Sequence, residues 1–239
     1  MMDKRVKEII DNSNSVVFFG GAGVSTESNI PDFRSETGLY HAKSKYGHAP
    51  EEMLSHTFFV NHMETFYEYY RENLIYPDAE PNKAHLALAR LEEEGKLIGV
   101  VTQNIDGLHQ AAGNKLVYEL HGSVHRNYCM DCGEFHDLDY IMSTDGIPRC
   151  RKCGGVVKPD VVLYEEGLDQ DVITKAVNAI ASADTLIIGG TSLAVYPAAS
   201  FISYFRGDNI ILINKGATSK DGIADLVIHE PIGEVLGDD

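Results

Sequence analysis

The chain has 239 residues, 44% of them hydrophobic, so it can bury a core without support from disulfides. Its formal net charge of −16 at pH 7 argues against sequence-independent binding of nucleic acid, which depends on Lys and Arg side chains. Its apolar runs are too short to cross a membrane, and Met1–Ile10 lacks the apolar stretch and cleavage site of a secretory signal. We therefore expect a cytoplasmic protein that binds neither nucleic acid nor membrane.

Short β-branched runs alternate with helical stretches along the chain, a pattern typical of a parallel sheet covered by helices. Helical periodicity is clearest at Asn82–Glu94 and Gln170–Ala181. The expected strands are 15–19, 97–102, 116–119, 185–189, 209–213 and 226–229. The sequence therefore predicts an α/β fold built on a Rossmann-type parallel sheet.

A glycine-rich turn, Gly20–Thr26, follows the first expected strand. Such turns let pyrophosphate approach backbone N–H groups at the start of a helix, so this turn is a candidate nucleotide site. Thr26 stands where the dinucleotide motif has its third Gly or Ala, which argues against an ordinary dehydrogenase. A turn that binds no ligand is the alternative. The next segment, Pro31–His48, has little periodicity and is expected to form a loop over a site.

Two stretches interrupt the alternation of strands and helices. Residues 41–80 are helical and rich in Tyr, and residues 126–158 contain all the cysteines. We expect a helical insertion and a zinc ribbon that together form one smaller domain. Residues 1–40, 81–125 and 159–239 would then form a single Rossmann-type nucleotide-binding domain.

The cysteines form two C-x2-C pairs with seventeen residues between them: Cys129 with Cys132, and Cys150 with Cys153. Two thiolate knuckles can complete a tetrahedron, so this spacing predicts one zinc ion. Zinc with four thiolate ligands has no open position, so its role would be structural. Two disulfides or a redox C-x-x-C are the alternatives. Three glycines follow the pairs, where the knuckle backbone can require a positive φ: Gly133, Gly154 and Gly155.

A series of motifs occurs in a fixed order along the chain: Gly21–Ser25, Ile30–Ser35, Thr102–His109, Leu120–Gly122, the cysteine pairs, Gly190–Leu193, Val195–Pro197 and Ile213–Gly216. Together they resemble the sirtuin family over nearly the whole chain. The resemblance implies that NAD binds as co-substrate between the Rossmann-type core and the zinc-bearing domain. It also implies transfer of an acyl group from a protein lysine to ADP-ribose, with release of nicotinamide. The expected partners are acylated proteins or peptides, and the expected state is a monomer.

By this resemblance, the NAD-binding residues come from several separate motifs. Arg34 would lie near the phosphates, and Phe33 would shield the reacting ribose. Asp106 would hold the nicotinamide carboxamide, although an Asp of this kind can also be a turn or cap residue. The complete expected set is Ala22, Thr26, Phe33, Arg34, Gln103, Asn104, Ile105, Asp106, His121, Thr191, Ser192, Asn214 and Ile232.

His121 and Asn104 are the expected catalytic residues. Cleavage of the bond from ribose C1′ to nicotinamide develops oxocarbenium character, and the acyl oxygen must be held in line with C1′ to capture it. Asn104 would order ribose hydroxyls and a water. His121 would act as general base on a ribose hydroxyl, because imidazole has a pKa near neutrality. ADP-ribosyl transfer, NAD hydrolysis and a non-catalytic NAD sensor are the alternatives.

The expected substrate strand contains Val161, Val162 and Tyr164, and it departs from the family pattern at the next residue. Glu165 stands where the family has a glycine. Because such a strand pairs with the peptide backbone, this carboxylate could favour cationic residues beside the target lysine, or it could point harmlessly outward. Asn29 also replaces a usual glycine, a milder change because Asn tolerates positive φ.

The preference for the acyl group depends on the helical insertion. Sirtuins that prefer succinyl or malonyl lysine carry a Tyr and an Arg three residues apart, and Tyr70 stands where that Arg would be. A buried carboxylate without its cation is unfavourable, so we expect acetyl and longer neutral acyl groups to be preferred. A side chain of Arg71 that reaches into the pocket is the alternative.

Overall fold

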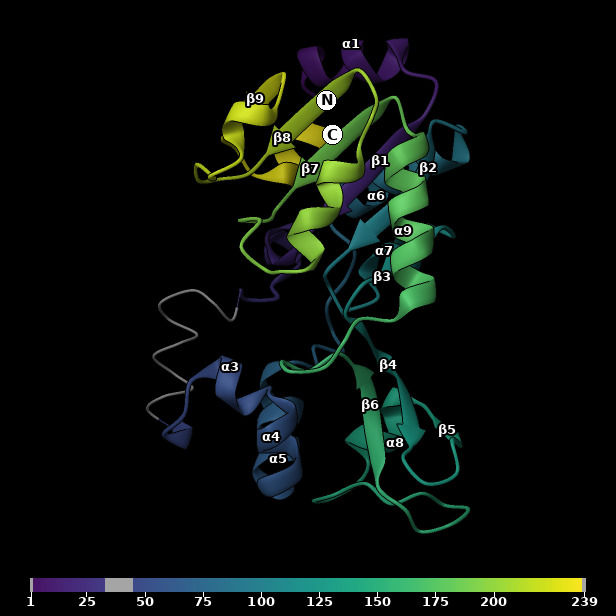
Figure 1. Ribbon diagram of the computed structural model, residues 1–239, viewed down its shortest axis with the longest axis vertical. Coiled ribbons are helices and arrows are strands. Elements are labelled where there is room, and N and C mark those ends of the chain that lie inside the picture. The colour runs from purple at the N-terminus through teal and green to yellow at the C-terminus, as the bar shows by residue number, and fades with distance from the viewer. Residues whose placement is uncertain (1, 33–44, 238–239) are drawn as a thin grey trace.

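The structure is a computed structural model that describes residues 2–32 and 45–237. It has two lobes, and both marked chain ends lie in the larger one (Figure 1). Within the described ranges no helix is both long and apolar enough to cross a membrane.

The larger lobe is built on a six-stranded parallel sheet in the order β3-β2-β1-β7-β8-β9. The strands are β1 (Val16–Gly20), β2 (Leu97–Thr102), β3 (Val117–Glu119), β7 (Thr185–Gly189), β8 (Asn209–Ile213) and β9 (Leu226–Ile228). The strand order reverses between β1 and β7, which is the dinucleotide-binding arrangement of a doubly wound sheet. All six predicted strands are confirmed, with ends that differ by at most one residue.

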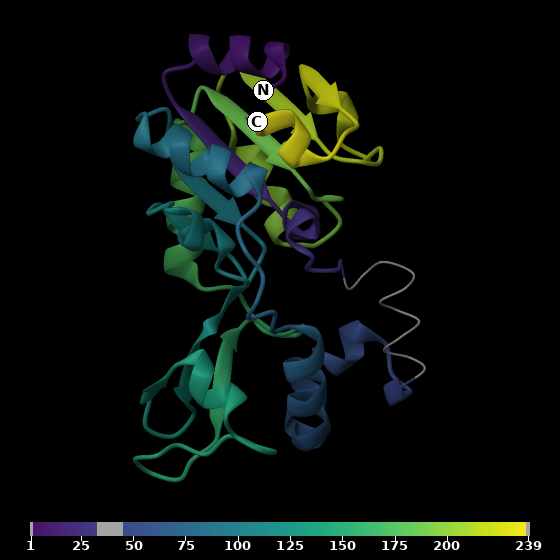
Figure 2. The same ribbon diagram turned by 180° about the vertical axis from the view of Figure 1, so that it is seen from behind.

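Alternate residues of each strand pack into separate cores on the two faces of the sheet. Val16 and Phe18 of β1 pack with one group of helices, whereas Val17 and Phe19 pack with another. The first group is α1 (Lys4–Asn12), α6 (Lys83–Glu93) and α10 (Ile232–Leu236); the second is α9 (Gln170–Ser182) and the 3-10 helix η2 (Ala198–Tyr204). Figure 2 shows α6 in front of the sheet, on the face opposite α9. Strands covered on both faces need apolar residues throughout, which explains their continuous hydrophobic runs.

The two predicted helices begin at side-chain caps. Asn82 accepts hydrogen bonds from the N–H groups of Ala84 and His85 at the start of α6. Asp169 accepts from two N–H groups at the start of α9. Asn82 also donates to the carbonyl of Val24, at 2.7 Å, so the same residue fixes α6 beside the glycine-rich turn.

The smaller lobe combines an antiparallel sheet with a group of helices (Figure 1). The sheet contains β4 (Gly122–Cys129), β5 (Phe135–His136) and β6 (Val157–Val161), next to α8 (Leu138–Met142). The helices are α3 (Pro50–Met53), α4 (His56–Asn61) and α5 (Met63–Asn73). Their aromatic side chains share one core with β4 and β6. The structure confirms the predicted fold class, while the expected domain boundaries at residues 126 and 158 fall inside β4 and β6, and that division stays a prediction.

Candidate active site

The backbone is closely packed where β1 and β7 end, next to the reversal of strand order. Gly190 has φ +58°, and a Cβ there would lie 2.4 Å from the backbone N of Val24. Gly23 donates its N–H to the carbonyl of Gly190 at 2.8 Å. Two glycine-containing turns therefore contact each other through backbone, and they form one wall of a crevice at the carboxyl ends of the strands.

The turn after β1 continues as the 3-10 helix η1 (Ala22–Ser28) rather than as an α-helix. The N–H groups of Gly21 and Gly23 donate to the carbonyls of Gly189 and Gly190, so these two amides are used within the protein. The expected approach of pyrophosphate to this turn stays a prediction. Asn29 ends η1 with φ +62°, as expected for an Asn that replaces a glycine.

Two adjoining cavities contact every described residue predicted to bind NAD or peptide. The larger, of about 420 Å³, is lined by Ala22, Gln103, Asn104, Ile105, Asp106, His121, Val161, Val162, Tyr164, Thr191, Ser192 and Asn214. The smaller, of about 200 Å³, is lined by Thr26, Asn214 and Ile232. Phe33, Arg34 and most of the expected Pro31–His48 loop lie outside the described residues.

A short polar network holds Asn104 and Asp106 in the larger cavity. The side-chain amide of Asn104 donates to Ser25 Oγ at 3.0 Å, and Ser25 Oγ donates to Asp106 Oδ2 at 2.6 Å. Asp106 Oδ1 accepts from the N–H of Leu108 at 2.9 Å, so Asp106 also has the local capping contact that the sequence left open. Sequence reasoning missed Ser25, although this residue ends the first quoted motif.

His121 is held by its backbone surroundings. Its Nδ1 lies 2.9 Å from the carbonyl oxygen of Gln103. A carbonyl can only accept, so Nδ1 carries the proton and Nε2 is the basic atom of the neutral ring. Gly122 follows with φ +74°, and a Cβ there would lie 1.8 Å from the carbonyl oxygen of Asp160. Only glycine therefore lets the chain turn into β4 directly after this histidine.

The expected substrate strand lies next to His121. Val162 donates its N–H to the carbonyl of His121 at 3.0 Å. Tyr164 donates to the carbonyl of Leu54 at 2.9 Å and accepts from the N–H of His56 at 3.0 Å. Both lobes thus contribute to this edge of the cavity. Further lining residues that were not expected from the sequence include Ile30, Leu54, Leu74, Tyr76, Leu163 and Tyr196.

Tyr70 and Arg71 do not line either cavity. Tyr70 is buried and stacks on Phe66 with ring centroids 5.8 Å apart. The Arg71 guanidinium donates to the carbonyls of Ile141 and Gly146, at 3.1 and 2.7 Å, in the smaller lobe. The structure thus gives no support to the alternative in which Arg71 reaches into the pocket.

The four cysteines converge at the far end of the smaller lobe. Their Sγ atoms all lie within 4.8 Å of one another, with separations such as 3.4 Å for Cys129 and Cys153 and 3.7 Å for Cys132 and Cys150. A zinc ion with tetrahedral bonds of about 2.3 Å requires sulfurs roughly 3.8 Å apart, whereas a disulfide requires about 2.05 Å. The cysteines therefore fit one structural zinc and form no disulfides.

Two of the three glycines beside the knuckles have the expected backbone. Gly133 and Gly154 have φ of +71° and +79°. The expectation of positive φ is wrong for Gly155; a Cβ there would lie 2.3 Å from Oδ2 of the exposed Asp131 side chain and 3.0 Å from Cys129 Sγ.

The sheet order, the glycine crevice and the cysteine cluster define a dinucleotide-binding α/β protein with a structural zinc site. The model of the Sir2 family matches residues 21–197, which is more than half of the chain. The chain belongs to the Sir2 family, the sirtuins, as the motifs predicted.

Relatives and solved structures agree over almost the full length. The chain is 64% identical to an NAD-dependent protein deacetylase of Clostridium acetobutylicum, over 99% of this chain and 98% of that protein. It is 62% identical to a protein of the same name from Clostridium perfringens, over 98% and 96% of the two chains. A structure of Sir2 with a p53 peptide and NAD+ superposes with a TM-score of 0.86 at 36% identity, covering 99% of this chain and 96% of that one. A structure of Sir2 bound to acetylated peptide superposes with a TM-score of 0.85 at 35% identity, again covering 99% of this chain and 96% of that one.

Proposed function

We propose that this protein is an NAD-dependent protein lysine deacylase. It transfers the acyl group of an acyl-lysine to ADP-ribose and releases nicotinamide and O-acyl-ADP-ribose. The names of its relatives and the peptide and NAD+ complexes of its structural neighbours support this proposal. The observation that carries it is the position of His121, which lines one cavity with Asn104 and Asp106 and holds Val162 through its carbonyl.

Each residue of the site has a task in this proposal. Asp106 and Ile105 hold the nicotinamide carboxamide, and Asn104, fixed by Ser25, orders the ribose. His121 removes a proton from a ribose hydroxyl through Nε2, because Nδ1 is engaged by a backbone carbonyl. The residues proposed for the phosphate and adenosine end are Ala22, Thr26, Gln103, Thr191, Ser192, Asn214 and Ile232, together with Phe33 and Arg34 from the segment outside the described ranges.

Zinc has no part in the chemistry that we propose. Cys129, Cys132, Cys150 and Cys153 would hold the ion with four thiolates, and such a site supplies a fixed structure rather than an activated water. We further propose that the protein acts as a monomer in the cytoplasm on acylated proteins or peptides, without contact to nucleic acid or membrane. The charge of −16 supports the exclusion of nucleic acid.

The reaction class is tested by incubation with an acetylated peptide, with and without NAD. We expect nicotinamide release that depends on both, and mass spectrometry should find O-acetyl-ADP-ribose. Free ADP-ribose without peptide, or ADP-ribosylated protein, would support the alternative chemistries instead. An NAD sensor would release no nicotinamide at all.

The role of His121 is tested by His121→Ala. Loss of a general base lowers kcat by about 100-fold or more, whereas zinc content should stay at that of the wild type because His121 lies just before β4 and the first cysteine lies at the opposite end of that strand. Nearly full activity of this variant would show that the base is another group.

A further inference from the structure

A tight turn follows the substrate strand. Glu166 donates its N–H to the carbonyl of Leu163 at 3.0 Å, which closes a four-residue β-turn. Glu165, the third residue of the turn, has φ +76°. This conformation favours glycine, which is the residue that sirtuins usually have here, so a side chain at Glu165 must be held in place by other contacts.

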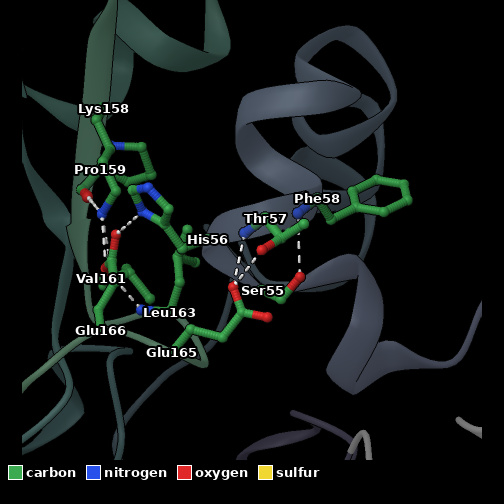
Figure 3. Close-up of polar contacts among 10 residues, drawn as sticks. All are labelled: Ser55, His56, Thr57, Phe58, Lys158, Pro159, Val161, Leu163, Glu165 and Glu166. Carbon is green, nitrogen blue, oxygen red and sulfur yellow. Dashed lines mark hydrogen bonds and ion pairs between the residues drawn. The ribbon is translucent and has the colours of Figure 1, made fainter.

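The Glu165 side chain is bound by helix α4. Its Oε2 accepts hydrogen bonds from the N–H and from the Oγ1 of Thr57, at 2.8 and 2.7 Å (Figure 3). The hydroxyl and the N–H of Thr57 lower the pKa of Glu165. The carboxylate is therefore engaged by the helical insertion and does not point freely toward an incoming peptide.

The Glu166 side chain also stabilises this turn. Its Oε2 accepts from the N–H of Leu163 at 2.9 Å and from Lys158 Nζ at 3.1 Å, and its Oε1 lies 2.9 Å from His56 Nδ1 (Figure 3). Burial alone would raise the pKa of Glu166, but these hydrogen bonds and the Lys158 charge outweigh burial and lower it. Glu166 thus closes the turn, and Glu165 attaches the turn to α4.

The attachment lies next to the residue that lines the cavity. Tyr164 directly precedes Glu165 and is joined by backbone hydrogen bonds to Leu54 and His56, which flank the start of α4. The backbone hydrogen bonds to Leu54 and His56 hold Tyr164 itself. The hydrogen bonds between Thr57 and Glu165 hold the carboxyl end of the substrate strand. If that end were released, the backbone pairing alone would hold Tyr164 at the cavity.

We infer that Glu165 is a positioning residue for the peptide, and that it acts by anchoring the end of the substrate strand to Thr57 of α4. This inference rests on the proposed function. It decides between the two alternatives that the sequence left open, because a carboxylate that accepts two hydrogen bonds from α4 serves as a structural acceptor rather than as a selector of cationic peptides.

The test compares Glu165→Ala with Glu165→Gln. Gln keeps an oxygen that can accept both bonds from Thr57 but has no charge. We expect Glu165→Ala to raise KM for an acetyl-peptide about fivefold, the effect of losing roughly one net hydrogen bond of ordinary strength, with KM for NAD unchanged. Glu165→Gln should stay within about twofold of the wild type, since it retains the acceptor.

Thr57 supplies a second and milder pair of variants. Thr57→Val removes Oγ1 and leaves the N–H, so KM for peptide should rise about two- to threefold, whereas Thr57→Ser keeps the hydroxyl and should match the wild type. Adding Thr57→Val to Glu165→Ala should cause no further rise, because both changes break the same contact. Additive effects would overturn the inference.

A peptide pair separates positioning from charge selection. The wild type and Glu165→Gln are compared on two acetyl-peptides, one with basic and one with acidic flanking residues. An equal ratio of KM values in both proteins supports positioning, whereas loss of a preference for the basic peptide in Glu165→Gln overturns it. An unchanged KM in Glu165→Ala would also overturn it. If the wild type released no nicotinamide with any peptide, the proposed function itself would have failed.

Discussion

At the scale of single residues, a buried histidine pair lies behind the Asp106 turn. The rings of His85 and His109 lie 4.7 Å apart, and both side chains are almost inaccessible to solvent. Within the described part of the chain, neither nitrogen of His109 has a hydrogen-bond partner. Burial lowers the pKa of His85 to about 4, and burial together with the neighbouring His85 lowers the pKa of His109 well below its usual value. Both rings are therefore neutral in the folded protein near neutral pH.

This pair predicts a loss of stability in acid. In the unfolded chain these two histidines bind protons below about pH 6.5, whereas folded His85 does so only near its lowered pKa of about 4. The unfolded state therefore binds more protons in this range, and the free energy of unfolding decreases as the pH falls below about 6.5. Each histidine contributes a slope of up to about 1.4 kcal/mol per pH unit. We expect His109→Leu to flatten this slope, measured by urea unfolding across that range.

The exposed His62 supplies a control for this measurement. His62→Gln should leave the slope of the wild type intact, because this side chain is not part of the buried pair. Equal slopes for His109→Leu and the wild type would contradict the assignment of the acid sensitivity to this pair.

Individual site residues were predictable where a motif fixes them and not where packing does. The motifs singled out His121, Asn104 and Asp106, which line one cavity, and their part in the site stays a prediction. The bond from Ser25 to Asp106 joins residues 81 positions apart, so no local pattern could indicate it. The orientation of the Glu165 side chain was also unpredictable, because it depends on hydrogen bonds from Thr57, which is 108 positions away.

At the scale of elements, the sequence predicted the large sheet well because burial on both faces demands continuous apolar runs. It also predicted α6 and α9, which have long apolar stripes and side-chain caps. The turn after β1 was less predictable, because its 3-10 form depends on contact with the distant turn at Gly190. The helices α3 and α4 are too short to be stable alone, and they depend on the core of the smaller lobe, into which Met53, Phe58 and Phe59 are packed.

The smaller sheet should depend on its metal. β4 ends at Cys129, and β6 begins shortly after Cys153, so the thiolates attach these two paired strands to one point. Structural zinc contributes on the order of 10 kcal/mol to folding in small metal-bound units. We expect Cys150→Ala to lose its zinc, its deacylase activity and several degrees of melting temperature, measured by metal analysis and calorimetry.

Met130 provides the matched control for the zinc experiment. It lies between the first two cysteines and is 53% exposed, so Met130→Ala should keep one zinc per chain and the melting temperature of the wild type. A Cys150→Ala protein with unchanged melting temperature and activity would show that the metal does not support the fold.

At the scale of the whole molecule, the cavity lies where the two lobes meet. Arg126 of β4 links them: it donates to Glu119 of β3 at 2.6 Å and to Asp160 of β6 at 2.8 Å. β4 begins one residue after His121, so the smaller sheet starts at the catalytic candidate itself. Sequence composition could not find this junction, because the same strand belongs to the site and to the smaller lobe.

The charge of this shared cavity leads to a prediction of its acyl preference. Among the described residues that line the larger cavity there is no Lys or Arg, and the charged ones are Asp32, Asp106, Glu165 and Glu166. Arg71 is engaged by carbonyls of the smaller lobe, and Tyr70 is packed on Phe66. Since Glu165 and Glu166 are engaged by Thr57, His56 and Lys158, an acyl group that ends in a carboxylate would meet Asp32 and Asp106 and no described cation in the lining of this cavity.

We predict that acetyl- and butyryl-lysine peptides react faster than the succinyl-lysine peptide. A buried carboxylate without a partner is disfavoured by about 3 kcal/mol or more, which corresponds to at least a 100-fold lower kcat/KM. The measurement is nicotinamide release from three peptides that differ only in the acyl group. Tyr70→Phe should keep this order, because its buried hydroxyl does not line the cavity. Faster reaction of the succinyl peptide would require a cation at the acyl site and would contradict the prediction.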